Sequence, residues 1–274
     1  RTIGEHAIDC AWERVAAYTY AADERQVAAV EREAETLREA GLQAELTTGT
    51  PLPFAVPAAV RLDRQAQLHP LRYVRALAAQ VAAAGSHVFE GTPVVGVGEG
   101  EPCRVRTEAG PVVTARDVVV ATNYPVLDRG LFFARTEAAR SYLVAARVRA
   151  GAPDGMLISA GEPTRSVRSY ADGRGTWVLV GGEGHATGSS KAQPARYGRL
   201  EAFAREHWDV VEIPYRWSAQ DGMPADLLPY AGPYTPRSAH LFVVAGGQKW
   251  GMTNATIGAH VVAGRLTGRE HPLA

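Results

Sequence analysis

The segment Leu241–Gly268 constrains the fold more than any other part of the sequence. It begins with the apolar run LFVVA, passes through a turn that contains Gly246, Gly247 and Gly251, and ends in a helical pattern, TNATIGAHVVAGRLTG. A buried strand that leads through a tight glycine turn into a helix N-terminus suits the binding of an anion or a cofactor. Lys249 lies in this turn and is one of two lysines among 29 basic residues, so we expect the loop to need a small, flexible cation.

The composition argues against several classes of protein. The 274 residues, 46% of them hydrophobic, are enough for a large core and for two domains. The 29 acidic and 29 basic residues cancel, and no basic run interleaved with aromatic residues occurs, so we expect no nucleic-acid partner. No apolar run approaches the roughly 20 residues of a membrane helix, and residues 1–10 lack the apolar core of a signal peptide. We therefore expect a soluble, cytoplasmic protein without membrane association.

The two cysteines predict neither a disulfide nor a metal centre. Cys10 and Cys103 match neither C-x-x-C nor the spacing of metal ligands. We expect both to be buried free thiols, and no metal site is predicted.

The first half of the chain alternates between helical and strand patterns. Apolar spacing predicts one helix that starts after Asp23 and ends at Gly41, and a second from Pro70 to Gly85. Short strands are then predicted in HVFEG, TPVVGVG, CRVRT, VVTA and DVVVAT, with a hairpin turn at residues 108–111. The continuous apolar run at residues 118–121 indicates a strand that is covered on both faces, as in an α/β sheet.

The second half predicts a sheet of its own. The strand candidates SYLVAARVRA, GMLISA and TWVLVGG suggest an antiparallel sheet, and a helix is expected at about residues 195–208. The stretch from Ile213 to Gly232 is rich in aromatic residues, proline and glycine, which predicts a fixed loop. Two sheets built from interleaved segments imply a mixed α/β protein with two discontinuous domains.

Several short motifs have ordinary structural explanations. The glycines at 96, 98 and 100 lack the third glycine of a dinucleotide fingerprint and predict a strand and turn, and those from 182 to 188 miss the spacing by one residue and predict a loop. His185 in that loop faces either a ligand or solvent. The run Asp221–Pro224 is either a simple turn or part of an active-site loop. The absence of G-x-S-x-G and H-E-x-x-H motifs argues against a hydrolase or a metalloprotease.

Four strings, in order along the chain, resemble one family. They are QLHPLRYVRALA, VVVATNYP, WSAQDGMPADLLPYAG and VVAGGQKWGMTNATIGAHVVAGRLTGREHP. Together they resemble the D-amino acid oxidase-like FAD-dependent oxidoreductases, and they are most similar to the subgroup in which a Rieske iron–sulfur domain follows the flavoprotein portion. The resemblance implies an FAD-binding domain of Rossmann-like fold (residues 1–11, 64–133 and 231–274) interleaved with an antiparallel-sheet substrate domain (residues 12–63 and 134–230).

The resemblance also implies which residues contact FAD. Ala121, Thr122 and Asn123 look like the segment that passes the phosphate and ribose, and Val94 or Val95 is similar to the position whose backbone meets the adenine. The residues that look like the loop beside the flavin ring are Gly246, Gly247, Lys249, Trp250, Gly251, Met252 and Thr253. Reduced flavin carries negative charge near its pyrimidine edge, so the partial positive charge of a helix N-terminus suits this place.

Five further residues look like candidates to face the substrate. They are Arg165, Arg168, His185, Trp217 and Met223. An arginine among them would form a bidentate pair with a carboxylate, and the alternative is a surface ion pair that contributes little to stability.

The resemblance implies an FAD-dependent oxidoreductase. In that chemistry hydride passes from the amine-bearing carbon of an amine or amino acid to the flavin, and electrons then pass to dioxygen or to a Rieske-type iron–sulfur partner. The sequence shows no counterpart of the family's N-terminal G-x-G-x-x-G unit or of the Rieske C-x-H and C-x-x-H pairs, so we expect a core trimmed at one or both ends. The alternative is a non-catalytic binding or scaffolding remnant that no longer holds FAD.

Overall fold

The computed structural model describes residues 2–127, 129–189, 193–269 and 272 of the chain. It divides into two compact units, each built from two separate stretches of sequence. Unit 1 comprises Arg1–Leu77 and Arg140–Ala219, and unit 2 comprises Ala78–Ala139 and Gln220–Ala274. The assignment of one domain to FAD and the other to the substrate stays a prediction.

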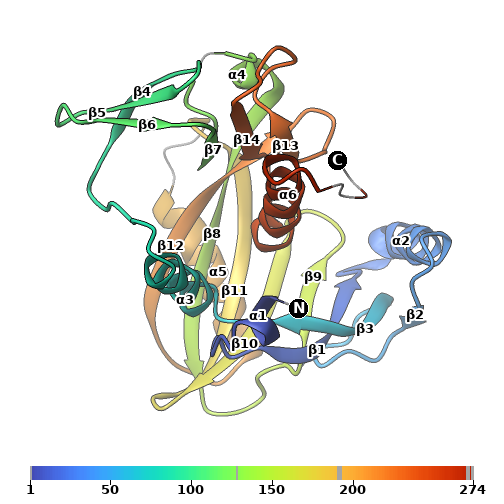
Figure 1. Ribbon diagram of the computed structural model, residues 1–274. Coiled ribbons are helices and arrows are strands. Elements are labelled where there is room, and N and C mark those ends of the chain that lie inside the picture. Colours follow the sequence, from blue (N-terminus) through green and yellow to red (C-terminus); the bar gives the residue numbers. More distant parts are fainter. Residues whose placement is uncertain (1, 128, 190–192, 270–271, 273–274) are drawn as a thin grey trace. The chain divides into compact units, whose positions relative to one another are not determined.

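An eight-stranded sheet supplies the framework of unit 1. Its strand order is β12-β8-β11-β10-β9-β1-β3-β2 (Figure 1). The strands are β1 (Glu13–Tyr20), β2 (Ala44–Thr47), β3 (Ala59–Gln67), β8 (Thr136–Val148), β9 (Met156–Ser159), β10 (Arg165–Asp172), β11 (Gly175–Ala186) and β12 (Val210–Pro224). β10 pairs antiparallel with both β9 and β11, whereas β1 pairs antiparallel with β3 and parallel with β9.

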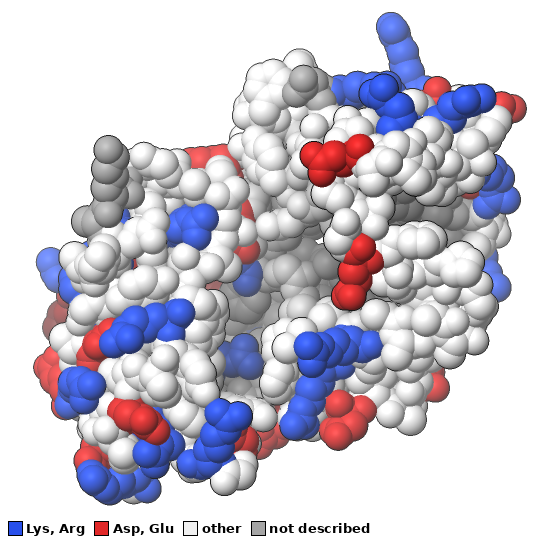
Figure 2. Space-filling view, turned by 90° about the vertical axis from the view of Figure 1, so that its left-hand side faces the viewer, with Lys and Arg blue, Asp and Glu red and all other residues white. Residues whose placement is uncertain are grey.

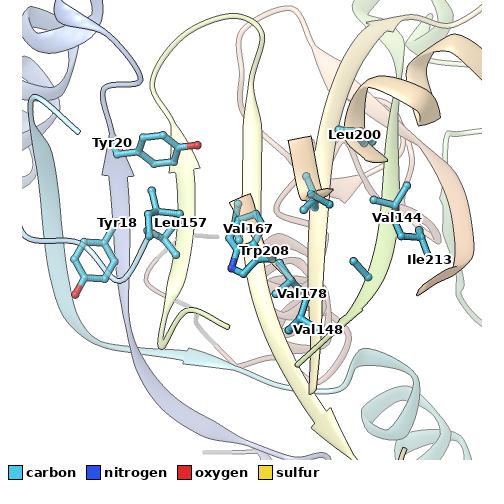
Figure 3. Packing of buried hydrophobic residues seen from close by; sticks show 14 of the residues in the cluster. Tyr18, Tyr20, Val144, Val148, Leu157, Val167, Val178, Leu200, Trp208 and Ile213 are labelled. Atoms are coloured by element: carbon cyan, nitrogen blue, oxygen red, sulfur yellow. The ribbon is translucent and has the colours of Figure 1, made fainter. Parts of the chain in front are cut away.

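The largest cluster of buried residues in unit 1 lies on one face of this sheet, and a smaller cluster contains Val30, Ala34 and Val60. Val178 and Val180 alternate with residues of the opposite face on β11, and Val167 does the same on β10. Leu200 and Trp208 cover them from α5 (Gln193–His207) and the residue that follows it (Figure 3). The other helices that begin in this unit are α1 (Thr2–Glu5), the 3₁₀ turn η1 (Glu24–Gln26), α2 (Val27–Glu39) and α3 (Pro70–Ala83).

Unit 2 contains two three-stranded sheets. One has the order β13-β14-β7, with β7 (Val118–Asn123), β13 (Tyr230–Pro233) and β14 (Leu241–Ala245), and the other is the meander of β4 (Val94–Gly98), β5 (Cys103–Thr107) and β6 (Val112–Ala115). A short helix, α4, spans Phe132–Arg135. The helix α6 (Gly251–Leu266) packs against β13 and β14 (Figure 1). Gly258 permits this close packing, because a Cβ there would lie 2.8 Å from Cγ1 of Val244.

Most of the expected elements are confirmed. The two early helices, the helix near residues 195–208, the terminal strand and helix, and the hairpin between β5 and β6 all occur. Cys10 and Cys103 are buried free thiols, as expected. Among the described residues, no helix is long and apolar enough to cross a membrane. Figure 2 shows basic and acidic side chains intermixed over the face in view.

Four local predictions are wrong. Residues 118–121 do lie in the strand β7, but the strand is not covered on both faces, because Val119 is 40% exposed. The stretch HVFEG forms no strand, and its Phe89 is 70% exposed, so the apolar character of this run does not reflect burial. The expected loop at residues 213–232 is largely strand, because β12 lies at the edge of the sheet, where Pro214 and Pro224 are tolerated without their N–H groups. The expected glycine loop from residue 182 is the end of β11, where a Cβ on Gly182 would lie 2.2 Å from the Thr164 carbonyl oxygen.

Candidate functional site

The predicted cofactor segments of unit 2 meet where two parallel strands end. β7 and β14 pair in parallel, with Val118 opposite Leu241 and Asn123 opposite Ala245. Both strands therefore end at the same edge of their sheet, which is where ligands bind in open α/β sheets. The structure thus brings the 121–123 segment beside the loop that begins at Gly246.

The backbone of this loop is fixed by two close contacts. Gly246 has a φ of +69°, and a Cβ there would lie 2.6 Å from Cγ of Pro224, so only glycine fits without a shift. The amide of Gln248 donates to the Gly222 carbonyl at 3.2 Å, and Gln248 itself has a φ of +52°. The loop is therefore held against the end of β12.

The start of α6 leaves backbone donors available. Trp250 occupies the N-cap position without a side-chain hydrogen bond, and among the described residues no acceptor faces the amides of Gly251 and Met252. A Cβ on Gly251 would meet no atom within 4 Å, and its φ is not in the left-handed region. Neither packing nor backbone conformation explains this glycine. The free amides and the open space beside it suit a polar or anionic ligand that approaches the backbone closely.

Two charged side chains lie near this loop. Lys249 is exposed, and Asp221 on β12 is partly buried. Burial raises the pKa of Asp221, and the positive charge of Lys249 opposes this rise. The Asn123 amide donates to the Gln220 carbonyl at 3.1 Å, which ties the end of β7 to the same part of β12.

The remaining predicted residues of unit 2 lie on other elements or play local roles. Thr122 donates its hydroxyl to the Tyr124 carbonyl at 2.8 Å. Val94 and Val95 lie on β4, in the other sheet of the unit, and are 49% and 58% exposed. Met223 lies on β12 between Gly222 and Pro224.

A cavity of about 750 Å³ opens on the large sheet of unit 1, and all of its lining residues belong to that unit. Arg168 and Trp217, two of the predicted substrate residues, both line it. Tyr170 and Asp172 follow Arg168 at intervals of two residues on β10, so the three side chains project from the same face of the sheet. Trp177 and Tyr215 complete an aromatic wall.

Arg165 and His185 are engaged elsewhere in unit 1. Arg165 is 9% exposed and donates to Oε1 of Glu183 at 2.6 Å. Glu183 also accepts hydrogen bonds from Arg199. Burial opposes ionisation of Glu183, but the hydrogen bonds from Arg199 and Arg165 prevail and lower its pKa. His185 Nε2 lies 2.9 Å from the Tyr142 hydroxyl, and its Nδ1 lies 2.8 Å from the Ala186 carbonyl oxygen.

Sequence reasoning missed the aromatic wall and the carboxylate near Lys249. Tyr170 shares the two-residue period of Arg168 on a strand, so alternation along β10 would have indicated it. Trp177 and Tyr215 come from different strands, and no local pattern in the sequence links them. The sequence predicts that Asp221 belongs to either a turn or an active-site loop, but it gives no sign that its carboxylate lies near Lys249.

The chain matches known proteins along nearly its full length. Residues 1–265 match the family model described as FAD dependent oxidoreductase (DAO). The putative Rieske 2Fe-2S iron-sulfur protein YhfW of Bacillus subtilis (strain 168) is 31% identical over 271 residues. This match covers 98% of the present chain and 53% of YhfW, so the chain spans about half the length of that relative.

Solved structures share the fold at low sequence identity. The glycine oxidase from Geobacillus kaustophilus gives a TM-score of 0.83 at 18% identity, over 98% of this chain and 75% of that chain. L-proline dehydrogenase from P. horikoshii gives a TM-score of 0.78 at 17% identity, over 98% and 76%. These similarities confirm the predicted fold class.

Proposed function

The chain belongs to the DAO family of FAD-dependent oxidoreductases, as its motifs predict, and from this premise we propose that it forms the core of an enzyme that oxidises an amine or amino acid. When bound, FAD supplies the hydride acceptor for the carbon that carries the amine. The protein supplies binding, orientation and electrostatics, and no dedicated general base is required.

One observation carries this proposal. The parallel strands β7 and β14 end side by side, and the chain then passes through a constrained glycine loop to an uncapped helix whose first amides are free among the described residues. Gly251 adds open space that neither packing nor φ explains. These residues fit a large, polar cofactor that lies against the backbone.

Each part of the loop has a distinct expected role. The amides of Gly251 and Met252, with the partial positive charge of the α6 N-terminus, would hold negative charge on the cofactor. Lys249 would add a full positive charge at the same place. Gly246 and Gly247 would keep the loop narrow, because side chains there would press on Pro224 and on Gly251.

The electron acceptor is either dioxygen or an iron–sulfur centre. The relative YhfW is named as a Rieske 2Fe-2S iron-sulfur protein, and this chain spans about half of its length. We propose that a Rieske-type iron–sulfur centre is the electron acceptor.

Anaerobic mixing of the FAD-loaded natural protein with a panel of amines and amino acids tests the proposal. At least one compound should bleach the visible absorbance of oxidised flavin. Readmitted air should then yield little hydrogen peroxide if an iron–sulfur centre is the acceptor, and stoichiometric peroxide would instead identify dioxygen. Failure of the protein to take up FAD would contradict the enzyme proposal and favour a binding or scaffolding protein.

A further inference from the structure

Arg168 is a cation without a counter-ion in the cavity of unit 1. Among the described residues, none accepts a hydrogen bond from its guanidinium or forms an ion pair with it. Arg165, three residues earlier on the same strand, is instead paired with Glu183 at 2.6 Å. The cavity walls displace part of the hydration of Arg168 and thereby lower its pKa, although the residue remains exposed to water. A partly dehydrated guanidinium with unused donors favours an anionic ligand.

Three other charged groups of the cavity have partners, whereas Asp154, which also lines it, has no hydrogen-bond or ion-pair partner among the described residues. Asp172 accepts from the indole N–H of Trp177 at 3.0 Å and from the Arg174 amide at 2.9 Å. The guanidinium of Arg174 donates to the Tyr215 hydroxyl at 2.8 Å. Glu13 accepts from Gln67 at 2.9 Å. Arg174 keeps some unused donors, but Arg168 is the arginine of the lining whose guanidinium has no partner at all among the described residues.

The walls around Arg168 are aromatic. Trp177 and Tyr215 pack with their ring centroids 5.7 Å apart, and His69 and Tyr170 form an edge-to-face pair at 5.7 Å. Trp217 lines the same space and is 39% exposed. Flat apolar groups pack well against such rings. A volume of about 750 Å³ also exceeds what a ligand of a few atoms would fill.

We propose that this cavity binds a carboxylate that carries an aromatic or similarly flat apolar group, with Arg168 holding the carboxylate and the aromatic wall holding the ring. A guanidinium matches a carboxylate through two parallel N–H···O bonds. The identification of this ligand with the substrate rests on the proposed oxidoreductase function, and the binding itself does not. A bulky aromatic amino acid, and not glycine, is then the expected class of substrate.

Isothermal titration calorimetry of the purified chain without flavin tests the binding. The probes are phenylacetate, acetate, which lacks the ring, and 2-phenylethanol, which lacks the charge. Phenylacetate should bind at least about tenfold more tightly than either of the others. Arg168→Gln should weaken phenylacetate binding by about tenfold or more, and Arg168→Lys should weaken it less. Arg25→Gln, which alters an exposed ion pair outside the cavity lining, should leave the affinity unchanged.

Leu179→Trp provides a second test, because the larger side chain fills part of the cavity while Arg168 keeps its charge. It should abolish phenylacetate binding while the chain keeps its cooperative thermal transition. Undetectable binding of phenylacetate to the wild-type chain, or equal affinity in the wild-type, Arg168→Gln and Leu179→Trp proteins, would overturn the proposal. Because no flavin is present, neither result depends on whether the natural protein oxidises amines.

Discussion

The cavity of unit 1 and the glycine loop of unit 2 are built in opposite ways. The cavity is defined by side chains, a guanidinium and several aromatic rings from separate strands and loops. The loop after β14 is defined by the backbone, through glycines and the free amides of a helix start. A site made of side chains selects ligands by charge and shape, whereas a site made of backbone suits a cofactor that must lie close to the main chain.

The side-chain-built unit 1 gives the largest expected effect, which comes from the difference between a buried and a more exposed arginine–glutamate pair. Glu183→Ala leaves the buried Arg165 without its partner, and this should lower the free energy of unfolding by about 3 to 5 kcal/mol. Glu212→Ala, which breaks the more exposed pair with Arg147, should cost less than about 1 kcal/mol. Urea unfolding of both variants measures the difference. A similar loss of unfolding free energy in the two variants would show that the burial of the Arg165–Glu183 pair does not increase the cost of removing its carboxylate.

A second prediction compares two glycines of the loop. Gly246→Ala places a side chain at positive φ and against Pro224, so it should destabilise the chain by about 2 to 4 kcal/mol. Gly251→Ala fills open space at the start of a helix and should be neutral or stabilise by up to about 1 kcal/mol. Thermal and urea unfolding without FAD give both values. Equal destabilisation would mean that Gly251 is also held by the packing of the protein.

A third, smaller effect concerns unit 2, where the side chain of His240 contacts two carboxylates. His240, which precedes β14, lies 2.9 Å from Oδ1 of Asp117 and 2.9 Å from Oε1 of Glu101. Hydrogen bonds to Asp117 and Glu101 raise the pKa of His240. Its contribution to stability is therefore full below its unfolded pKa of about 6.5 and is lost as the pH rises through the folded value.

The pH dependence of a variant measures this contribution. The wild-type chain should exceed His240→Gln in melting temperature by more at about pH 6 than at about pH 9. The same difference at both values would show that the charge of His240 adds nothing to the stability of unit 2.

The two sites also differ in how far the sequence predicts them. The loop site is local, because Gly246, Lys249 and Gly251 are close in sequence and follow an apolar strand, so the sequence itself predicts that they share one turn. The cavity gathers residues from far apart in the sequence, and of the five predicted substrate residues only Arg168 and Trp217 line it. Arg165 looks equivalent to Arg168 in the sequence. Because side chains alternate along β10, Arg165 points to the face where Glu183 lies, and Arg168 points to the opposite face, where the cavity opens. The composition of the segment does not reveal which face is buried.

The misassigned β12 has a similar cause. Its prolines and glycine indicate a loop when they are considered alone, but a strand at the edge of a sheet tolerates them. Whether a strand is at an edge depends on the order of all eight strands, which local patterns do not contain.

The central claim is that the start of α6 lies against FAD, and the FAD affinity of the natural protein tests this claim most directly. Calorimetric titration of the flavin-free protein would compare Gly251→Val with Gly198→Val, an equivalent change in α5 at a glycine whose Cβ would also meet no atom within 4 Å. We predict that Gly251→Val weakens FAD binding by about tenfold or more, since its side chain would occupy the space that we propose for the cofactor, and that Gly198→Val binds FAD as the wild type does. Equal FAD affinity in all three proteins would contradict the account.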